Sequence, residues 1–353
     1  MLRLGAVSCV LIGFVSAAAL ADVVVVVNRT TDIQHFSIDS QLEFIDAKLE
    51  PNESRPFPTS GDPVLILGNS RLAVGKQFPT TKLRPNAVYR LSTIDEETKV
   101  ARSNLGGNEF TLKPDPDLLK LQASGKKKKI PVSLWVDDDH LDPQTKWEPK
   151  LRERFAEAAK IIKRYSGVEF EVSFVGRWRS SNRIRVFSGS LHEFIDEVNP
   201  KDTLAIGFSR QYSRVDASGS TRIAGTRQPL DQHILVREWE RTISEAERVE
   251  LLVHELGHFL GACHSTDKKS AMRSELADGA ARKEDFRIGF DPANTLIMYI
   301  VGEQLSQKGQ SGGLSNLKKL TPQTQRRLRQ IYSRLATRTP SDPVPTKYLL
   351  LLE

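Results

Sequence analysis

Three histidines and a glutamate stand close together in HELGHFLGACH, residues 254–264, although the whole chain has only seven histidines. His254 and His258 are four residues apart. On a helix this spacing puts their Cβ atoms about 6 Å apart on one side. Because imidazole nitrogen is a preferred ligand of Zn²⁺, the spacing predicts that both side chains can bind one metal ion.

A third ligand must come from outside this helical turn, and His264 is six residues beyond His258. Gly261 lies between them and can adopt a positive φ, end the helix and turn the chain sharply. This bend would bring His264 back to the metal. Three imidazoles then leave one position of a tetrahedral ion open for water, which is the arrangement of a catalytic zinc site.

Glu255 is adjacent to His254 but is not one of the three ligands. It is placed to take a proton from the water and pass it to a leaving amine. Zinc lowers the pKa of its bound water to about 7, so the set of residues predicts peptide-bond hydrolysis. The alternative is a core helix with exposed histidines that do no chemistry, and three histidines at these offsets in a histidine-poor chain argue against it.

The helix that must carry these residues is predicted from Ser244 to Gly261. Ser244 and Glu247 form a capping box at its start, and Gly261 is a natural stop. Apolar residues at helical spacing form one stripe along it: Val249, Leu252, Val253, Leu256, Phe259 and Leu260. At about 100° per residue, His254 and His258 lie opposite this stripe. We therefore expect one side of the helix to pack on the core and the histidines to face outward.

The full string H-E-x-x-H-x-x-G-x-x-H resembles the signature of the metzincin clan of zinc endopeptidases, in which a Met-turn follows it. The resemblance implies that the three histidines are zinc ligands, that Glu255 is the general base and that Gly261 forms the turn. It also implies a metzincin-like catalytic fold, with a twisted mixed sheet and a long active-site helix.

Met272, eight residues after His264, fits the methionine of the Met-turn, and this offset is similar to the matrixin branch. Met298, in the apolar stretch TLIMYIV, is the other candidate and fits better a helix packed in the core. The chain departs from matrixins in two ways. The predicted β unit has no cysteine that could cap the zinc, and only His233 lies where a structural-zinc loop would need several histidines. One zinc ion is therefore expected.

Two further features are weaker. Calcium could bind at the acidic stretches DDDH, residues 137–140, and DASGS, residues 216–220, although both are explained more simply as turns with solvated carboxylates. By the same resemblance, TRIAGTR at residues 221–227 would be an edge strand that pairs with an extended peptide substrate.

The rest of the chain divides by composition. Residues 1–21 place Arg3 before an apolar run that ends in Ala-Leu-Ala, which predicts a secretory signal peptide cleaved after Ala21. Residues 22–112 contain short β-branched and apolar runs bounded by turn residues, which predicts a small all-β sandwich. Residues 113–129 bring together prolines, Ser-Gly and four lysines, which is typical of a linker.

Residues 130–340 alternate strand and helix patterns, which predicts an α/β (α+β) unit with a mixed sheet. IPVSLWV, TLAIGF and HILVRE are expected to be strands. KLRERFAEAAKIIKRYSG is expected to be a helix that ends at Gly167. Residues 341–353 are a tail for which the sequence suggests no structure.

The composition excludes several classes of protein. With 39% hydrophobic residues the chain is not disordered, and its net charge of +7 is that of a moderately basic surface. We find no nucleic-acid-binding motif, and beyond the leader no stretch approaches the roughly 20 apolar residues of a membrane helix. Cleavage would remove Cys9 and leave Cys263 alone, without an internal disulfide. A secreted or periplasmic protein is expected, with its oligomeric state open.

Two hypotheses of different class follow. The first is an exported zinc-dependent endopeptidase that acts on protein or peptide substrates. The second is a binding or adhesion protein with a vestigial or structural zinc site. Glu255 favours the enzyme, because a purely structural site gains nothing from it. The residues indicate neither the substrate nor whether residues 22–129 are a removable pro-segment or a permanent domain.

Overall fold

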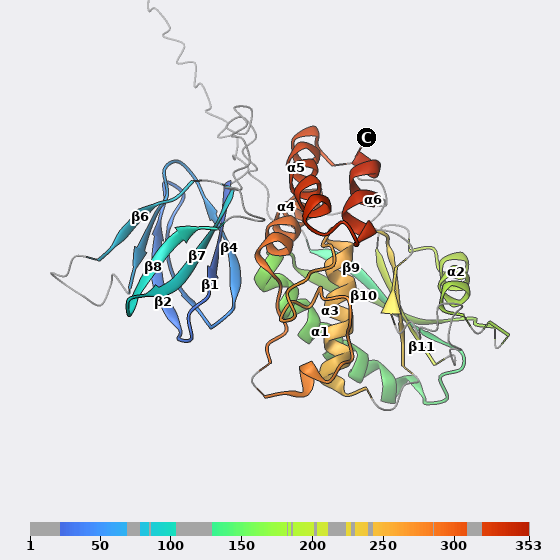
Figure 1. The fold of residues 1–353 in the computed structure, drawn as a ribbon. Coiled ribbons are helices and arrows are strands. Elements are labelled where there is room, and N and C mark those ends of the chain that lie inside the picture. Colours follow the sequence, from blue (N-terminus) through green and yellow to red (C-terminus); the bar gives the residue numbers. More distant parts are fainter. Residues whose placement is uncertain are drawn as a thin grey trace, which may run out of the picture.

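The structure is a computed structural model, and it describes most of the chain (Figure 1). The described residues are 22–68, 78–84, 86–103, 129–181, 183–184, 186–200, 203–210, 224–226, 230–238, 243–284, 286–308 and 320–352. The expected signal peptide, nearly all of the expected linker and the DASGS stretch lie outside them. Among the described residues, no helix has the length and apolar character needed to cross a membrane.

The described residues of the N-terminal unit form eight strands in two four-stranded sheets, with strand orders β4-β1-β7-β8 and β3-β2-β5-β6. A shared apolar core lies between the sheets and includes Phe36, Ile38 and Leu91. The strand bounds are β1 Asp22–Asn28, β2 Gln34–Asp39, β3 Phe44–Leu49, β4 Ser54–Thr59, β5 Val64–Leu67, β6 Thr80–Lys82, β7 Ala87–Ile94 and β8 Glu97–Arg102.

Strand β1, with the sequence DVVVVVN, is buried on both faces. Val24 and Val26 point into the core of the sandwich, whereas Val23, Val25 and Val27 belong to the core of the second unit. A strand buried on both sides needs a continuous apolar run and not an alternating one. The valine run thus makes this sheet the middle layer between the outer sheet and the helices beside it, of which α4 is one (Figure 1).

The second unit has a five-stranded sheet of order β10-β9-β11-β13-β12. Its strands are β9 Ile130–Asp137, β10 Phe170–Trp178, β11 Leu204–Ser209, β12 Ala224–Gly225 and β13 His233–Arg237. Neighbours pair in parallel except β12, which runs antiparallel to β13 at one edge. The sheet is therefore mixed, as the alternation of patterns predicts.

Helices cover both faces of this sheet. The bounds are α1 Gln144–Ser166, α2 Phe187–Glu197, α3 Glu245–Phe259, α4 Pro292–Lys308, α5 Pro322–Arg338 and α6 Pro343–Leu352. Helices α1 and α3 share the main core with one face of β9, β11 and β13. Helix α2 packs with Ala205 and Leu235 on the opposite face. Helix α1 ends at Gly167, which has a left-handed φ of 70°, as expected from the sequence.

Helix α3 is buried almost all round, so the expectation that its histidines face outward is wrong. His254, on the side of the helix opposite the apolar stripe, and Glu255, on the flank of the stripe, are only 6% and 5% exposed. The loop that contains Met272 and the C-terminal helix α6 supply the cover, through contacts to His254 and His258. Helical periodicity shows which side is apolar, but not that a later segment of the chain folds over the polar side.

The two units are joined by polar contacts as well as by the shared core. The Ser54 hydroxyl donates a hydrogen bond to the carbonyl of Phe290 at 2.7 Å and lies 2.8 Å from the Thr295 hydroxyl. The fully buried carboxylate of Glu53 lies 2.6 Å from the Arg164 guanidinium. Buried polar groups that are paired across a junction are costly to separate, because each would lose its partner.

We predict that cutting the chain between the units will not release the N-terminal unit. A specific protease site placed within residues 113–128 and cleaved under native conditions should leave two fragments that co-elute in size-exclusion chromatography. The Arg29→Ala variant is the control. It removes a partly exposed ion pair with Asp267, 3.2 Å long, which should contribute little to the association, so its fragments should also co-elute. Elution of the N-terminal fragment by itself would contradict a permanent junction and favour a removable pro-segment.

Candidate metal centre

The structure brings His254, His258 and His264 together. One nitrogen of each imidazole takes part in a cluster whose atoms all lie within 4.8 Å of one another. The Nε2 atoms of His254 and His258 are 3.1 Å apart. Two nitrogens at about 2.1 Å from a tetrahedral ion would be about 3.4 Å apart, so a small adjustment would fit both to one ion.

The Nδ1 atom of each ring lies near an oxygen atom. Nδ1 of His254 is 2.7 Å from the carbonyl oxygen of Ala271, and Nδ1 of His258 is 2.9 Å from that of Ala262. A carbonyl can only accept, so both Nδ1 atoms carry the proton and both Nε2 atoms present a lone pair to the cluster. Nδ1 of His264 lies 3.6 Å from Oδ1 of Asp342. Oxygen partners of this kind fix the tautomer of a metal-binding histidine.

The electrostatics favour a neutral His258. Burial, together with the neighbouring His254 and His264, lowers the pKa of His258 well below its usual value. Burial by itself would raise the pKa of Asp342, but its contact with His264 and a backbone hydrogen bond hold that pKa below its usual value. A neutral His258 and an ionised Asp342 are the forms that favour binding of a divalent cation.

Glu255 follows His254 on α3 and is 5% exposed. The helix that holds it is fixed at its start by the predicted capping box: the Ser244 hydroxyl accepts from the Glu247 amide, and the Glu247 carboxylate accepts from the Ser244 amide. Residues of a helix keep a fixed relation to one another, so Glu255 and the two helical histidines move as one body.

Gly261 forms the bend between the second and third histidines. Its φ is +86°, in the left-handed region that glycine adopts without strain. A side chain there would also collide, because a Cβ atom would lie 2.8 Å from the Tyr332 hydroxyl. The same hydroxyl donates a hydrogen bond of 2.8 Å to the Gly261 carbonyl. The glycine therefore permits the bend, and the hydrogen bond from Tyr332 on α5 stabilises it.

The backbone after the bend is fixed from α4. The Asn294 side chain accepts from the Cys263 amide at 2.8 Å and donates to the Cys263 carbonyl at 2.9 Å. Cys263 itself is fully buried, and this burial raises the pKa of its thiol well above the usual value. A free cysteine buried in this way acts as a small apolar packing residue.

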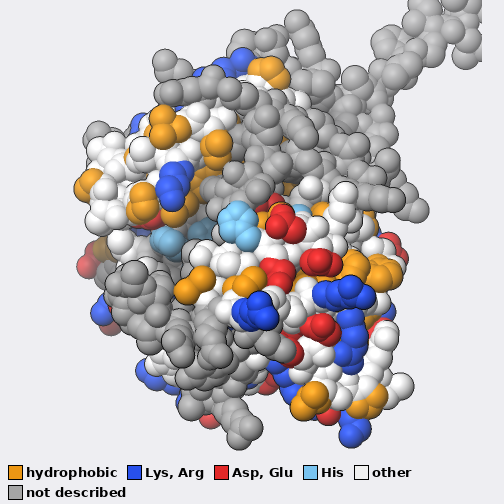
Figure 2. Space-filling view, turned by 90° about the vertical axis from the view of Figure 1, so that its right-hand side faces the viewer, with side chains coloured by type: hydrophobic (Ala, Val, Ile, Leu, Met, Phe, Trp, Pro, Cys, Tyr) orange, Lys and Arg blue, Asp and Glu red, His pale blue; other side chains and the backbone are white. Residues whose placement is uncertain are grey.

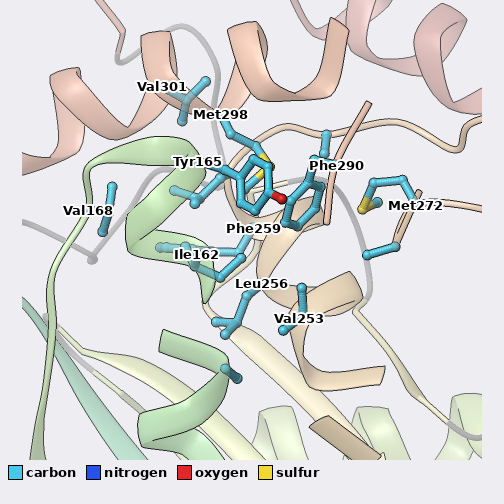
Figure 3. Packing of buried hydrophobic residues seen from close by; sticks show 14 of the residues in the cluster. Ile162, Tyr165, Val168, Val253, Leu256, Phe259, Met272, Phe290, Met298 and Val301 are labelled. Atoms are coloured by element: carbon cyan, nitrogen blue, oxygen red, sulfur yellow. The ribbon is translucent and has the colours of Figure 1, made fainter. Parts of the chain in front are cut away.

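Met272 packs against the turn of α3 that carries both helical histidines. Its Sδ atom would lie 2.6 Å from a Cβ atom added to Gly257. The Met272 carbonyl accepts from the Ser265 amide at 2.7 Å, which ties the loop to the residue after His264. Met298 lies instead on α4, and Figure 3 shows it in the buried apolar cluster. The structure thus places Met272, and not Met298, on the loop beside the histidines.

The acidic stretch at 137–140 has protein partners for its carboxylates. Asp137 accepts from the Ser209 hydroxyl and the Arg210 amide, both at 2.6 Å. Asp138 accepts from the amide and hydroxyl of Ser180 at 2.9 and 2.7 Å. Within the described ranges, the histidine cluster is the only group of three or more metal-ligating side chains. Calcium at 137–140 is therefore not supported.

Three functional residues were not predicted from the sequence: Tyr332, Asp342 and Tyr348. All lie in the C-terminal helices or directly before α6. The signal for a helix was present, because Asp342 precedes Pro343 and an apolar run follows it. Nothing in that segment indicates that it contacts residues 80 to 90 positions earlier.

Figure 2 shows histidine side chains on one face of the molecule, with acidic side chains beside them. His264 is partly accessible, with 35% of its side chain exposed, whereas His254 is buried. Strand β12, the described part of the expected substrate-pairing segment, is the last strand in the order of the sheet and contacts α3.

Comparisons with known proteins give little. No family model matches the chain, and no curated protein matches it. Among solved structures, it is similar to archaemetzincin from Methanopyrus kandleri, with 16% identity and a TM-score of 0.37 over 49% of this chain and 95% of that one. It is also similar to metalloproteinase-II from Bacteroides fragilis, with 12% identity and a TM-score of 0.36 over 72% and 78%.

A third similar structure is a chaperone–substrate complex, with 12% identity and a TM-score of 0.35 over 81% of this chain and 42% of that one. Similarities at this level assign neither a family nor an activity. The interpretation of the site therefore depends on its own geometry, which is a cluster of three imidazoles beside a buried glutamate.

Proposed function

We propose that this chain is an exported zinc-dependent endopeptidase of metzincin-like type. The observation that carries the proposal is the convergence of three imidazoles in which each Nδ1 faces an oxygen atom. A cluster of histidines that served only packing would have no need for this shared orientation. A zinc site, in contrast, depends on it, because the outer partner fixes which nitrogen faces the ion.

His254, His258 and His264 would hold one zinc ion, and three protein ligands are typical of catalytic sites. When bound, the ion supplies Lewis acidity that polarises a peptide carbonyl and acidifies water. Glu255 accepts the proton of the attacking water and delivers it to the amine of the leaving peptide. Its burial on α3 suits this role, because a carboxylate in a fixed position needs no reorganisation during the reaction.

The substrate would be an extended polypeptide. Strand β12 is the antiparallel edge of the sheet, and an edge strand offers unpaired backbone groups to another chain. Pairing of this kind binds main chain with little demand on sequence. We therefore expect hydrolysis within denatured proteins, with Met272 supporting the histidines from the adjacent loop.

Removal of the metal is the direct test of this function. The purified protein should hydrolyse a denatured casein-type substrate, lose that activity on dialysis against a chelator, and regain it with one equivalent of Zn²⁺. Mass spectrometry of the products would map the cleaved bonds. Tight binding of zinc by a chain that cleaves none of a broad set of denatured proteins would favour the alternative, a binding or adhesion protein with a structural zinc site.

Export and cleavage after Ala21 belong to the same proposal and are supported by the sequence of residues 1–21. Sequencing the N-terminus of protein recovered from outside the cytoplasm should give Asp22 as its first residue. Recovery of the chain with Met1 intact from the cytoplasm would contradict it.

A further inference from the structure

We propose that Asp342, at the start of α6, is the positioning residue of His264 and that it sets how tightly the centre retains zinc; this rests on the zinc site proposed above. The sequence assigns the tail from 341 to 353 no role. The structure brings it against the segment that carries the third ligand, through Asp342 itself and through the hydroxyl of Tyr348. The hydroxyl of Tyr332 on α5 contacts the same segment.

The third histidine differs from the other two in how it is supported. His254 and His258 stand on α3 and direct Nδ1 to backbone carbonyls. His264 stands beyond the bend on non-helical backbone, and 35% of its side chain is exposed. A half-exposed imidazole outside a helix has several rotamers and two tautomers open to it. Its orientation therefore depends on the group that Nδ1 faces, which is Oδ1 of Asp342 at 3.6 Å.

The carboxylate of Asp342 is itself built into the fold. Its Oδ1 accepts a hydrogen bond of 3.0 Å from the Val344 amide in the first turn of α6, which fixes the side chain as a helix cap does. The side chain is only 12% exposed, and its Oδ2 is buried without a hydrogen-bond partner. A buried carboxylate oxygen without a hydrogen-bond partner is unfavourable, and a nearby donor would stabilise it. The nearby Nδ1–H of His264 can supply one after a small rotation.

Two tyrosines hold α5 and α6 against the bend. The Tyr348 hydroxyl lies 3.3 Å from the His258 carbonyl and 3.4 Å from the Ala262 carbonyl. The Tyr332 hydroxyl donates to the Gly261 carbonyl at 2.8 Å. The two rings stack with centroids 4.5 Å apart and planes 7° apart, and both are fully buried. Helices α5 and α6 therefore contact the bend before His264, and the same packing places Asp342 near the His264 ring.

The consequence is a separation of roles along the chain. The bend and the tyrosines fix the backbone of the third ligand, and the carboxylate fixes its ring. Loss of the carboxylate should leave the fold in place but allow the His264 ring to turn away from the other two. Outer partners of metal-binding histidines are worth about 10- to 100-fold in metal affinity.

The test uses the full mature chain and zinc alone. Asp342→Asn keeps the shape of the side chain and removes its charge. Its zinc Kd, measured by competition with a chromophoric chelator, should rise by about 10- to 100-fold, whereas the melting temperature of the metal-free protein should hardly change. Asp342→Glu, which restores a carboxylate, should recover part of the affinity. Asp267→Asn is the matched control, since it removes a carboxylate three residues from His264 that pairs with Arg29 instead.

The possible outcomes distinguish the positioning role of Asp342 from the proposed peptidase activity. An Asp342→Asn variant that binds zinc as tightly as the unaltered protein overturns the positioning role, and leaves the proposed peptidase activity untouched. A wild-type protein that binds zinc tightly without cleaving protein overturns the peptidase proposal, while the affinity comparison still holds. Should Asp342→Asn fail to fold, Asp342→Ser replaces it, because its hydroxyl can still accept from the Val344 amide at the start of α6 while the carboxylate is removed; an unchanged zinc Kd there would also overturn the proposal.

Discussion

Replacing Glu255 by alanine should lower kcat on a denatured protein substrate by about 100- to 10,000-fold while the protein keeps its zinc. The side chain stands next to His254 on a helix whose start is fixed by a capping box, and it is 5% exposed. It is not one of the three clustered imidazoles, so its loss removes the proton acceptor without removing a ligand. Activity should fall and metal content should not.

Two controls separate chemistry from folding. Glu255→Gln has nearly the same volume as the native side chain and cannot accept the proton, so it should be as inactive as the alanine variant. Glu157→Ala, on the exposed side of α1, removes a carboxylate remote from the site and should leave the activity unchanged. Activity should be measured together with zinc content by atomic spectroscopy. Full activity in either Glu255 variant would refute the role of this residue as general base.

Replacing His264 by alanine should remove both the zinc and the activity. Two helical histidines alone leave the ion with two protein ligands, one fewer than catalytic zinc sites have. The loss of affinity should far exceed the roughly 10- to 100-fold expected for an outer residue such as Asp342. Because 35% of the His264 side chain is exposed, the substitution leaves little new cavity, and the metal-free protein should still unfold cooperatively.

The matched control for this variant is His192→Ala, which removes an exposed histidine from α2. Zinc should be titrated by calorimetry into both metal-free variants. The His192 variant should bind one equivalent as the unaltered protein does. One equivalent bound with undiminished affinity by the His264 variant would exclude this histidine from the centre and, with it, the three-imidazole site.

These two experiments and the Asp342 comparison form a series. They remove in turn the proton acceptor, a ligand and a partner of a ligand. The expected pattern is loss of activity alone, loss of metal and activity, and weakened metal binding with the fold preserved. A structural zinc site would reproduce the loss of metal in the second experiment and the weakened binding in the third, but it would show no peptidase activity for the Glu255 or His264 variants to abolish. The series therefore discriminates the peptidase from the binding protein.

Local features of the chain could be predicted from the sequence because they depend on neighbouring residues. The capping box of Ser244 and Glu247, the left-handed Gly261 and the left-handed Gly167 at the end of α1 are all present in the structure. Each follows from backbone hydrogen bonds or φ preferences within a few residues. The spacing of the histidines belongs to the same class, since the geometry of one helical turn brings two of them together.

Features that depend on distant segments were missed. The valines of β1 alternate between two cores, and only the assembled layers show that the second core belongs to the other unit. The histidine side of α3 is buried because residues 262–272 and α6 fold over it. An apolar stripe predicts that one side of a helix is buried. It cannot predict that another segment covers the opposite side when that segment makes its contacts through backbone carbonyls.

The sequence by itself therefore determined which residues could do chemistry: three imidazoles, a glutamate and a glycine bend whose spacing is set by one helix and one turn. Only the tertiary structure decided what holds them. Asp342 and Tyr348 meet the bend across 78 and 86 residues of chain, from His264 and Ala262 respectively. Such contacts arise from the packing of whole helices, and no local preference of the residues involved encodes them.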